Sequence, residues 1–174
     1  MERAEVPGAS EQMELKRLVD QYGNSLLRTC LIYLTDWAEA EDALQEVFIR
    51  TWRHIDLFLS GDIRQEKAWL MRTAMNICHD IHKSKWFRHI NTSVTLDELP
   101  VHLAAVLPED HALLIDVCNL PERYKQILLL YYYQGMSLQE TAEVLNISKT
   151  AANKRLHKAQ DMLKGRLTEG GGDE

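Results

Sequence analysis

The stretch that decides the fold is Ser137–Leu156, which reads SLQETAEVLNISKTAANKRL. Ser137 is a good helix N-cap, and Glu140 follows it at the three-residue spacing of a capping box. Asn146 tolerates the left-handed backbone conformation that ends a helix. Ser148 can then cap a second helix two residues later. The segment therefore predicts two short helices joined by a tight turn.

The second of these helices has one apolar face and one basic face. Ala152, Leu156 and Ala159 recur at three- and four-residue spacing and should pack inward, against the small Ala142 of the first helix. The outward face carries Lys149, Asn153, Lys154, His157 and Lys158. Asparagine and lysine side chains on such a helix can reach base edges in the major groove, while flanking cations meet phosphates. The pattern predicts a helix-turn-helix that binds duplex DNA, with a structural hairpin that has a basic outer face as the alternative.

The rest of the chain also has helical periodicity and no alternating strand pattern of any length. Apolar residues spaced three and four apart predict helices over about 11–34, 37–55 and 65–85. Another helix opens at Leu120-Pro121-Glu122 and ends near Gly135. We expect an all-α fold of two small helical domains joined by a flexible acidic linker, the C-terminal domain being the helix-turn-helix. The expected boundaries are 11–88, 89–112 for the linker, and 113–168.

Charge is distributed unevenly along the chain. The net charge is −6, yet residues 64–88 carry a net charge of +4 and residues 148–166 a net charge of +5. Residues 89–118 contain no Lys or Arg and carry a net charge of −5. Because electrostatic effects act over about 8–10 Å at physiological salt, each basic segment could bind a polyanion on its own. Ordinary solvated helix faces are the alternative.

Composition limits the class of protein further. Hydrophobic residues make up 45% of the chain, enough for a packed core. The three cysteines are far apart and odd in number, which favours a reducing compartment over a disulfide scaffold. No apolar run approaches the ~20 residues that span a bilayer, and residues 1–12 lack an apolar signal core. We expect a cytoplasmic protein that does not insert into a membrane.

Three stretches together resemble one known family. Residues 40–52 read AEDALQEVFIRTW, residues 68–80 read AWLMRTAMNICHD, and the helix-turn-helix lies within residues 120–167. In this order they resemble the bacterial extracytoplasmic-function (ECF, or group 4) sigma factors, which are specificity subunits of RNA polymerase. The resemblance covers about residues 15–167.

The resemblance implies three sets of contact residues. The helix over 40–52 is similar to the family's core-polymerase-binding helix, which implicates Asp42, Gln45, Glu46, Ile49 and Arg50. The helix over 68–80 and its flanks are similar to the helix that binds the promoter −10 element, which implicates Lys67, Arg72, Asn76, Lys83, Lys85 and Arg88. The C-terminal segment is similar to the −35-binding domain, which implicates Ser148, Lys149, Asn153, Lys154, Arg155, His157 and Lys158. Trp69 is expected to anchor the core rather than to contact DNA.

The family also implies a function. Such a protein binds core RNA polymerase, recognises the −35 element as duplex and the −10 element as a single strand, and helps to melt the −10 region. It starts transcription of a stress or envelope-response regulon and is held inactive by an anti-sigma factor. It is not an enzyme, and neither a cofactor nor a metal is expected, because the polymerase performs the chemistry.

Two other classes of protein fit parts of the sequence. A stand-alone helix-turn-helix regulator would bind duplex DNA as a dimer, without polymerase. A metal-dependent protein could use Cys78 and His82, which lie four residues apart, but the spacing lacks a second ligand pair. An enzyme is less favoured still, because no glycine-rich phosphate loop or nucleophile elbow is present.

Overall fold

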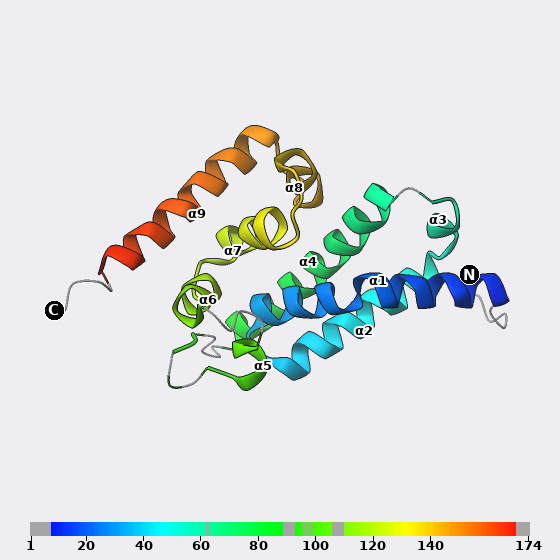
Figure 1. The fold of residues 1–174 in the computed structure, drawn as a ribbon, viewed down its shortest axis with the longest axis horizontal. Helices are drawn as coiled ribbons and strands as arrows, with labels where there is room; N and C mark the ends of the chain where they lie inside the picture. The colour runs from blue at the N-terminus through cyan, green and yellow to red at the C-terminus, as the bar shows by residue number, and fades with distance from the viewer. Residues whose placement is uncertain are drawn as a thin grey trace.

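A computed structural model describes residues 8–61, 63–88, 93–95, 97, 99–105 and 110–169, and over these residues the fold is helical with no strand (Figure 1). The elements are α1 (Ala9–Leu34), α2 (Trp37–Arg53), α3 (Asp56–Leu59), α4 (Ile63–Phe87), α5 (Val101–Ala104), α6 (His111–Cys118), α7 (Glu122–Leu128), the π-helical turn η1 (Leu129–Tyr133), α8 (Leu138–Val144) and α9 (Lys149–Glu169). The predicted all-α class is confirmed. The C-terminal residues 170–174 and part of the expected linker lie outside the described residues.

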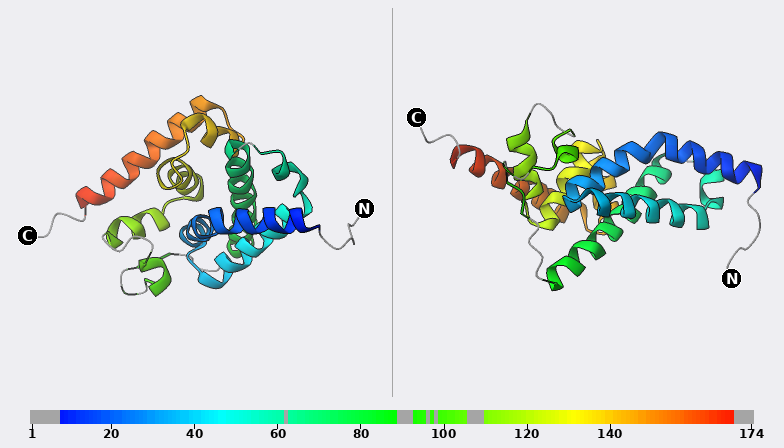
Figure 2. Two further views of the ribbon diagram at one scale, coloured as in Figure 1. Left: turned by 45° about the vertical axis from the view of Figure 1, so that its right-hand side comes forward. Right: turned by 90° about the horizontal axis from the view of Figure 1, so that it is seen from below.

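The first domain is built by α1, α2 and α4, which pack side by side (Figures 1 and 2). Thr35 takes a left-handed conformation with φ 59° and ends α1. Asp36 then caps α2, its carboxylate accepting from the Glu39 backbone N–H at 2.9 Å. Along α2 the predicted apolar positions Ala40 and Val47 are fully buried. The expected helix over 37–55 and its inward face are therefore confirmed.

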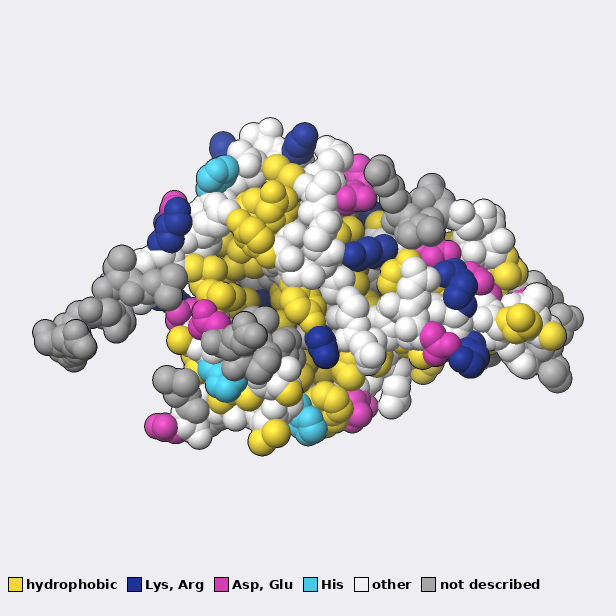
Figure 3. All heavy atoms as spheres, in the orientation of Figure 1, with side chains coloured by type: hydrophobic (Ala, Val, Ile, Leu, Met, Phe, Trp, Pro, Cys, Tyr) yellow, Lys and Arg dark blue, Asp and Glu magenta, His cyan; other side chains and the backbone are white. Residues whose placement is uncertain are grey.

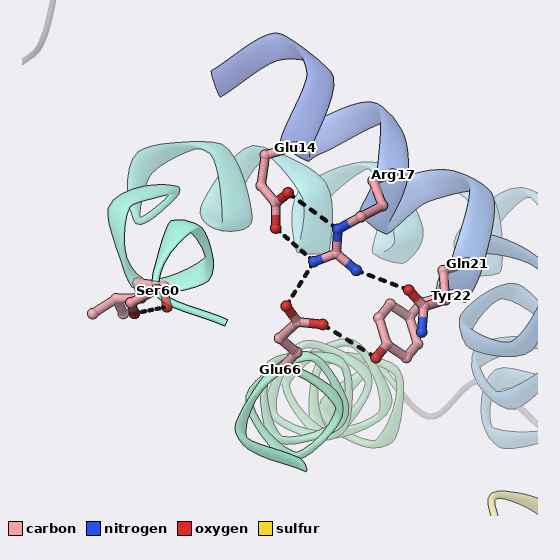
Figure 4. A network of polar contacts seen from close by, with 7 residues as sticks. Glu14, Arg17, Gln21, Tyr22, Ser60 and Glu66 are labelled. Atoms are coloured by element: carbon pink, nitrogen blue, oxygen red, sulfur yellow. Dashed lines mark hydrogen bonds and ion pairs between the residues drawn. The ribbon is translucent and has the colours of Figure 1, made fainter. Parts of the chain in front are cut away.

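A polar network fastens the start of α4 to α1 (Figure 4). Glu66 is 5% exposed and accepts from Arg17 at 2.6 Å and from the Tyr22 hydroxyl at 3.3 Å. Arg17 also binds Glu14 through two nitrogens, and hydrogen bonds to both carboxylates raise the pKa of its guanidinium. An ion pair between a guanidinium and a buried carboxylate is favourable only when the two side chains keep a fixed geometry. This network therefore positions the helix that carries the candidate −10 residues.

The C-terminal domain confirms the predicted helix-turn-helix. The Ser137 hydroxyl accepts from the Glu140 backbone N–H at 3.2 Å, and the Glu140 carboxylate accepts from the Ser137 N–H at 2.9 Å. Asn146 has φ 53°, and Ser148 caps α9 by accepting from the Ala151 N–H at 3.1 Å. Ala142, the small residue expected where the two helices cross, is buried in the core of this domain. The core of this domain contains Leu120, Ile127, Ala142, Ala152, Leu156 and Ala159.

Two features were not anticipated. The helix that opens at Glu122 continues after Leu128 as a π-helical turn, in which the Gln134 N–H donates to the Leu129 carbonyl at 2.9 Å. Within the expected linker, α5 buries Leu103 completely, and the His102 ring stacks on Trp37 at 4.1 Å. Helix α5 of the linker thus contacts the first domain.

The two domains share a continuous apolar interface. The main core cluster contains residues of α1, α2 and α4 and also Leu129, Leu130, Met136 and Val144 from the C-terminal half. Burial of such side chains is the dominant favourable term in association. The structure therefore has the helix-turn-helix domain packed directly against the first domain.

Candidate polymerase- and promoter-binding surfaces

The five candidate polymerase-binding residues form one strip on the outer face of α2. Asp42 and Gln45 are exposed, Glu46 and Arg50 are half-buried, and Ile49 is 47% exposed. Arg50 donates to Glu46 at 2.7 Å, one helical turn apart. The strip combines an exposed apolar residue with charges, and in Figure 1 α2 lies along the lower edge, away from α9. This is a surface suited to a partner helix.

The candidate −10 residues lie along α4 in different environments. Asn76, Lys83 and Arg88 are exposed. Lys85 is 9% exposed and forms an ion pair with Glu39 of α2 at 2.5 Å. Its ammonium is thus engaged within the first domain. Trp69 is partly buried against Phe58, with ring centroids 5.2 Å apart, as the expectation of a core anchor requires.

Two further candidate −10 cations form hydrogen bonds to the helix-turn-helix domain. The Lys67 ammonium donates to the Gln134 carbonyl, and the Arg72 guanidinium donates to the Glu143 carbonyl at 2.8 Å. Arg72 and Asn76 line a cleft of about 520 Å³ whose opposite wall includes Asn146, the turn residue of the motif. In this arrangement the middle of α4 therefore faces α8 and the turn across a solvent-exposed cleft.

Buried polar side chains complete the interdomain contact. Gln134 is 6% exposed; its amide donates to the Thr29 hydroxyl at 2.6 Å, and its side-chain oxygen accepts from Ser25 at 2.9 Å. Lys125 is 5% exposed and donates to the Tyr33 carbonyl at 3.0 Å. Burial lowers the pKa of the Lys125 ammonium. These bonds satisfy polar groups that would otherwise be costly to bury.

A carboxylate at the start of α7 joins the same contact. Glu122 accepts from the Tyr33 hydroxyl, and its Oε1 lies 2.8 Å from His79 Nδ1 of α4. Burial, followed by the bond to Glu122, raises the pKa of Tyr33. His82 lies one turn further along α4, and burial lowers its pKa. None of these interface groups was anticipated from the sequence, because each is a single polar residue within a helical pattern.

Helix α9, the predicted recognition helix, exposes its basic face. Asn153, Lys154, His157 and Lys158 are exposed, as are Ser148 and Lys149, while Arg155 is half-buried. Figure 3 shows Lys and Arg side chains spaced along the upper edge of the molecule, where Figure 1 places α9. The predicted −35 residues are thus brought together on one accessible surface, with Ala152, Leu156 and Ala159 buried behind them.

An apolar groove of about 590 Å³ lies between α9 and the rest of the molecule. It is visible as an apolar hollow in Figure 3. Its walls include Ile32 of α1, Leu114 and Val117 of α6, Tyr132 of η1 and Leu163 of α9. Grooves of this kind accept the apolar face of a helix.

The alternative sites receive no support from the arrangement. Cys78 is fully buried, and a hydrogen bond with the Cys30 thiol raises the pKa of the Cys78 thiol. Within the described residues, no three His, Cys, Asp or Glu side chains gather as a metal site would require. In the same part of the chain, none of the helices has the length and apolarity needed to cross a membrane.

Comparison with known protein families assigns both halves of the chain. Residues 18–88 match the family described as sigma-70 region 2, and residues 117–161 match sigma-70, region 4. The first match contains α2 and α4, and the second contains the helix-turn-helix.

Individual proteins are similar over nearly the whole length. The ECF RNA polymerase sigma factor SigW of Bacillus subtilis is 32% identical over 87% of this chain and 88% of that protein. The ECF sigma factor SigL of Mycobacterium tuberculosis is 29% identical over 97% of each chain. The fold resembles that of sigma factor RpoE, solved with the anti-sigma factor NepR from Bartonella quintana, at TM-score 0.71 and 18% identity over 89% of this chain and 97% of that one. It also resembles CnrH, solved with the cytosolic domain of CnrY, at TM-score 0.67 and 24% identity over 91% and 90% of the two chains. Since both domains and the length agree, the chain belongs to the family of extracytoplasmic-function RNA polymerase sigma factors.

Proposed function

We propose that this chain is a group 4 sigma factor that directs core RNA polymerase to promoters with defined −35 and −10 elements. The observation that carries the proposal is the exposed basic face of α9 in the same chain as the exposed strip of α2. The first surface suits a duplex and the second a protein helix. The chain supplies binding surfaces only, and the catalytic residues belong to the polymerase.

Docking on the polymerase uses Asp42, Gln45, Glu46, Ile49 and Arg50. Ile49 is the apolar centre of this strip, and its exposed side chain would be covered in the complex. An Ile49→Ala variant should bind core polymerase several-fold more weakly. Val19→Ala on α1 is a matched control, since Val19 is 40% exposed on another helix.

Duplex binding at the −35 element uses α9. We assign base contacts to Asn153 and Lys154, with Ser148, Lys149, Arg155, His157 and Lys158 at the helix start or beside the phosphates. Lysine contacts phosphates well but reads bases less specifically than the fork of arginine. The −35 preference should accordingly depend strongly on Asn153.

Single-strand binding at the −10 element uses α4, through Lys67, Arg72, Asn76, Lys83, Lys85 and Arg88. Because Lys67 and Arg72 are bonded to the helix-turn-helix domain, the two domains must separate before these cations reach DNA. Unstacking bases costs a few kcal/mol, which contacts to the captured strand offset. Promoter melting is thereby tied to opening of the molecule.

An anti-sigma factor is the proposed inhibitor, acting in the cytoplasm. Two proteins of the same fold were solved with such partners or with a partner's cytosolic domain. The apolar groove between α6 and α9 is the surface we assign to an amphipathic helix of that inhibitor. The proposed target genes form a stress or envelope-response regulon.

Run-off transcription tests the proposal. Core polymerase with and without this protein is incubated with a genomic fragment library, and the 5′ ends of the transcripts are sequenced. Start sites that share a motif pair and need the protein are the expected result. No protein-dependent start sites, together with no binding to core polymerase, would contradict the proposal. A dimer on duplex DNA would then indicate the stand-alone regulator.

A further inference from the structure

One asparagine side chain fastens the linker to the C-terminal domain. The Asn119 side-chain oxygen accepts from the Val94 N–H at 2.8 Å, and the Asn119 amide donates to the Val94 carbonyl at 2.6 Å. Val94 is 7% exposed and belongs to the main core cluster. Asn119 directly follows α6, so it belongs to the C-terminal domain. We call this contact between Val94 and Asn119 the Asn119 clasp.

A second anchor holds the linker on the first domain. The His102 ring of α5 stacks on Trp37, the first residue of α2, with ring centroids 4.1 Å apart. The neighbouring Leu103 is fully buried in the main core cluster. In Figure 1, α5 lies beside the start of α2. The later part of the linker is therefore docked on the domain that precedes the linker in the chain.

The two anchors are exchanged between the domains. Val94 lies six positions after Arg88, at the end of the first domain, yet it is bound to the C-terminal domain. His102 lies nine positions before His111, where α6 begins, yet it stacks on the first domain. If each part of the linker were docked on its neighbouring domain, the domains could separate with both contacts intact. Because the parts are exchanged, separation of the domains pulls on both anchors.

The clasp limits how far the two DNA-binding helices can move apart. The six residues from Arg88 to the clasp reach about 20 Å when fully extended. Asn76 of α4 lies twelve residues before Arg88. On α9, Lys154 lies twelve residues before Arg166, whose guanidinium is 3.5 Å from the Asn119 carbonyl oxygen. Each of these helical stretches adds about 18 Å, so with the clasp closed Asn76 and Lys154 stay within about 65 Å of each other, side chains included.

Promoter elements at −35 and −10 lie about 25 base pairs apart, which is roughly 85 Å of duplex. We propose that the Asn119 clasp is an internal restraint that must open before one chain can hold both elements. The inference rests on the proposed function, and it makes Asn119 a positioning residue rather than a DNA contact. Core polymerase that places the two domains at this spacing binds only the open fraction of molecules, so the closed clasp weakens its apparent affinity.

Hydrogen exchange and polymerase binding together test the clasp on the full chain. Asn119→Ala removes both hydrogen bonds, so NMR should show the Val94 amide exchanging at least about tenfold faster than in wild type. The same variant should bind core polymerase several-fold more tightly, because more molecules are open. An asparagine with a merely structural role would lower stability without raising this affinity. Asn24→Ala is the matched control and should change neither value, since Asn24 is exposed on α1 and lies outside the surfaces assigned above.

A second variant tests the other anchor. His102→Ala removes the stack on Trp37 and leaves the Asn119 side chain in place, and it should tighten binding to core polymerase about threefold. If Asn119→Ala does not fold, this variant alone decides, and unchanged polymerase binding overturns the restraint.

The remaining outcomes separate the restraint from the proposed function. A Val94 exchange rate that Asn119→Ala leaves unchanged would overturn the clasp. Faster exchange of the Val94 amide without tighter polymerase binding by either variant would overturn the restraint. If wild type itself does not bind core polymerase, the proposed function fails, whereas the exchange rate of the Val94 amide still reports on the clasp.

Discussion

Cys118 is the last residue of α6, and its thiol is almost completely buried. It is 3% exposed, and burial raises the pKa of this thiol to about 11. The folded chain therefore keeps the Cys118 proton at a pH where the unfolded chain releases it. A group whose folded pKa is raised stabilises the fold below its unfolded pKa and loses that contribution as pH rises through the folded pKa.

Replacing Cys118 should change how stability depends on alkaline pH. The thiol contribution should be complete below about pH 9 and lost by about pH 11, a change of about 2–3 kcal/mol in the free energy of unfolding. Cys118→Ala should remove that part of the alkaline decline. Urea unfolding of both proteins at pH 7, 9 and 10.5 measures it.

The same urea series contains its own control. The cavity left by Cys118→Ala destabilises equally at every pH, so only the pH-dependent difference reports the thiol. Parallel curves for the two proteins between pH 9 and 10.5 would show that Cys118 titrates alike in the folded and unfolded chains.

Lys154 and Asn153 are neighbours on α9 that we assign different tasks. Lys154→Ala should lower the slope of log affinity against log salt by about 1, because one phosphate contact is lost. Asn153→Ala should leave the slope unchanged and cost about 1–3 kcal/mol at one base pair of the −35 element. Holoenzyme titrations on −35 duplexes at several salt concentrations measure both effects. Equal salt slopes for all three proteins would reassign Lys154 away from the phosphates.

At the scale of elements, the cap of α8 can be tested without DNA. Ser137→Ala removes the hydroxyl that accepts from the Glu140 N–H, so the free energy of unfolding should fall by about 1 kcal/mol. Ser10→Ala, in the exposed first turn of α1, should change it by less than about 0.5 kcal/mol. Urea unfolding followed by circular dichroism compares them. A Ser137→Ala midpoint equal to that of Ser10→Ala would contradict the cap.

The long elements could be predicted from the sequence because their local signals agree. Three–four spacing predicted α1, α2 and α4, and capping residues together with that spacing predicted both helices of the motif, including the left-handed Asn146. Short α5 carries only one deeply buried residue, Leu103, so no periodicity could indicate it. The π-helical turn was equally unpredictable, since Leu129–Tyr133 has the composition of an ordinary buried helix.

At the scale of the molecule, two of the hydrogen bonds that join the domains come from α4. Lys67→Ala/Arg72→Ala removes the donors to the Gln134 and Glu143 carbonyls. These charged donors contribute about 1–3 kcal/mol after screening, so the share of separated molecules should rise about tenfold or more. Small-angle X-ray scattering should report a larger radius of gyration for this variant.

The control for that variant removes the same charge elsewhere. Lys16→Ala/Arg53→Ala changes a cation paired within α1 and an exposed cation of α2. Its radius of gyration should match that of wild type. If both double variants scatter alike, net charge rather than the two bonds controls the separation.

The arrangement of the two domains could not be read from the sequence. The resemblance indicated Lys67, Arg72 and Lys85 as DNA contacts, whereas here all three are engaged within the molecule. Gln134 and Lys125 stand in or beside an apolar run, and nothing in their local sequence shows which backbone groups they meet. Contacts between residues about a hundred positions apart depend on how whole domains pack, which local periodicity does not encode.

The π-helical turn makes the length of this segment as important as its composition. Each hydrogen bond of this turn encloses one residue more than a hydrogen bond of an α-helix. Gln134 comes directly after the turn, and its side-chain amide donates to the Thr29 hydroxyl. Deleting Tyr132 would let the segment return to α-helical winding, which removes the π-helical turn but leaves the direction of the chain beyond it nearly unchanged. Tyr132→Ala would keep the winding and the contact. During evolution this stretch should therefore tolerate the loss of one residue together with the π-helical turn, whereas a second deletion would rotate everything beyond it by about 100° and turn α9 away from its present orientation.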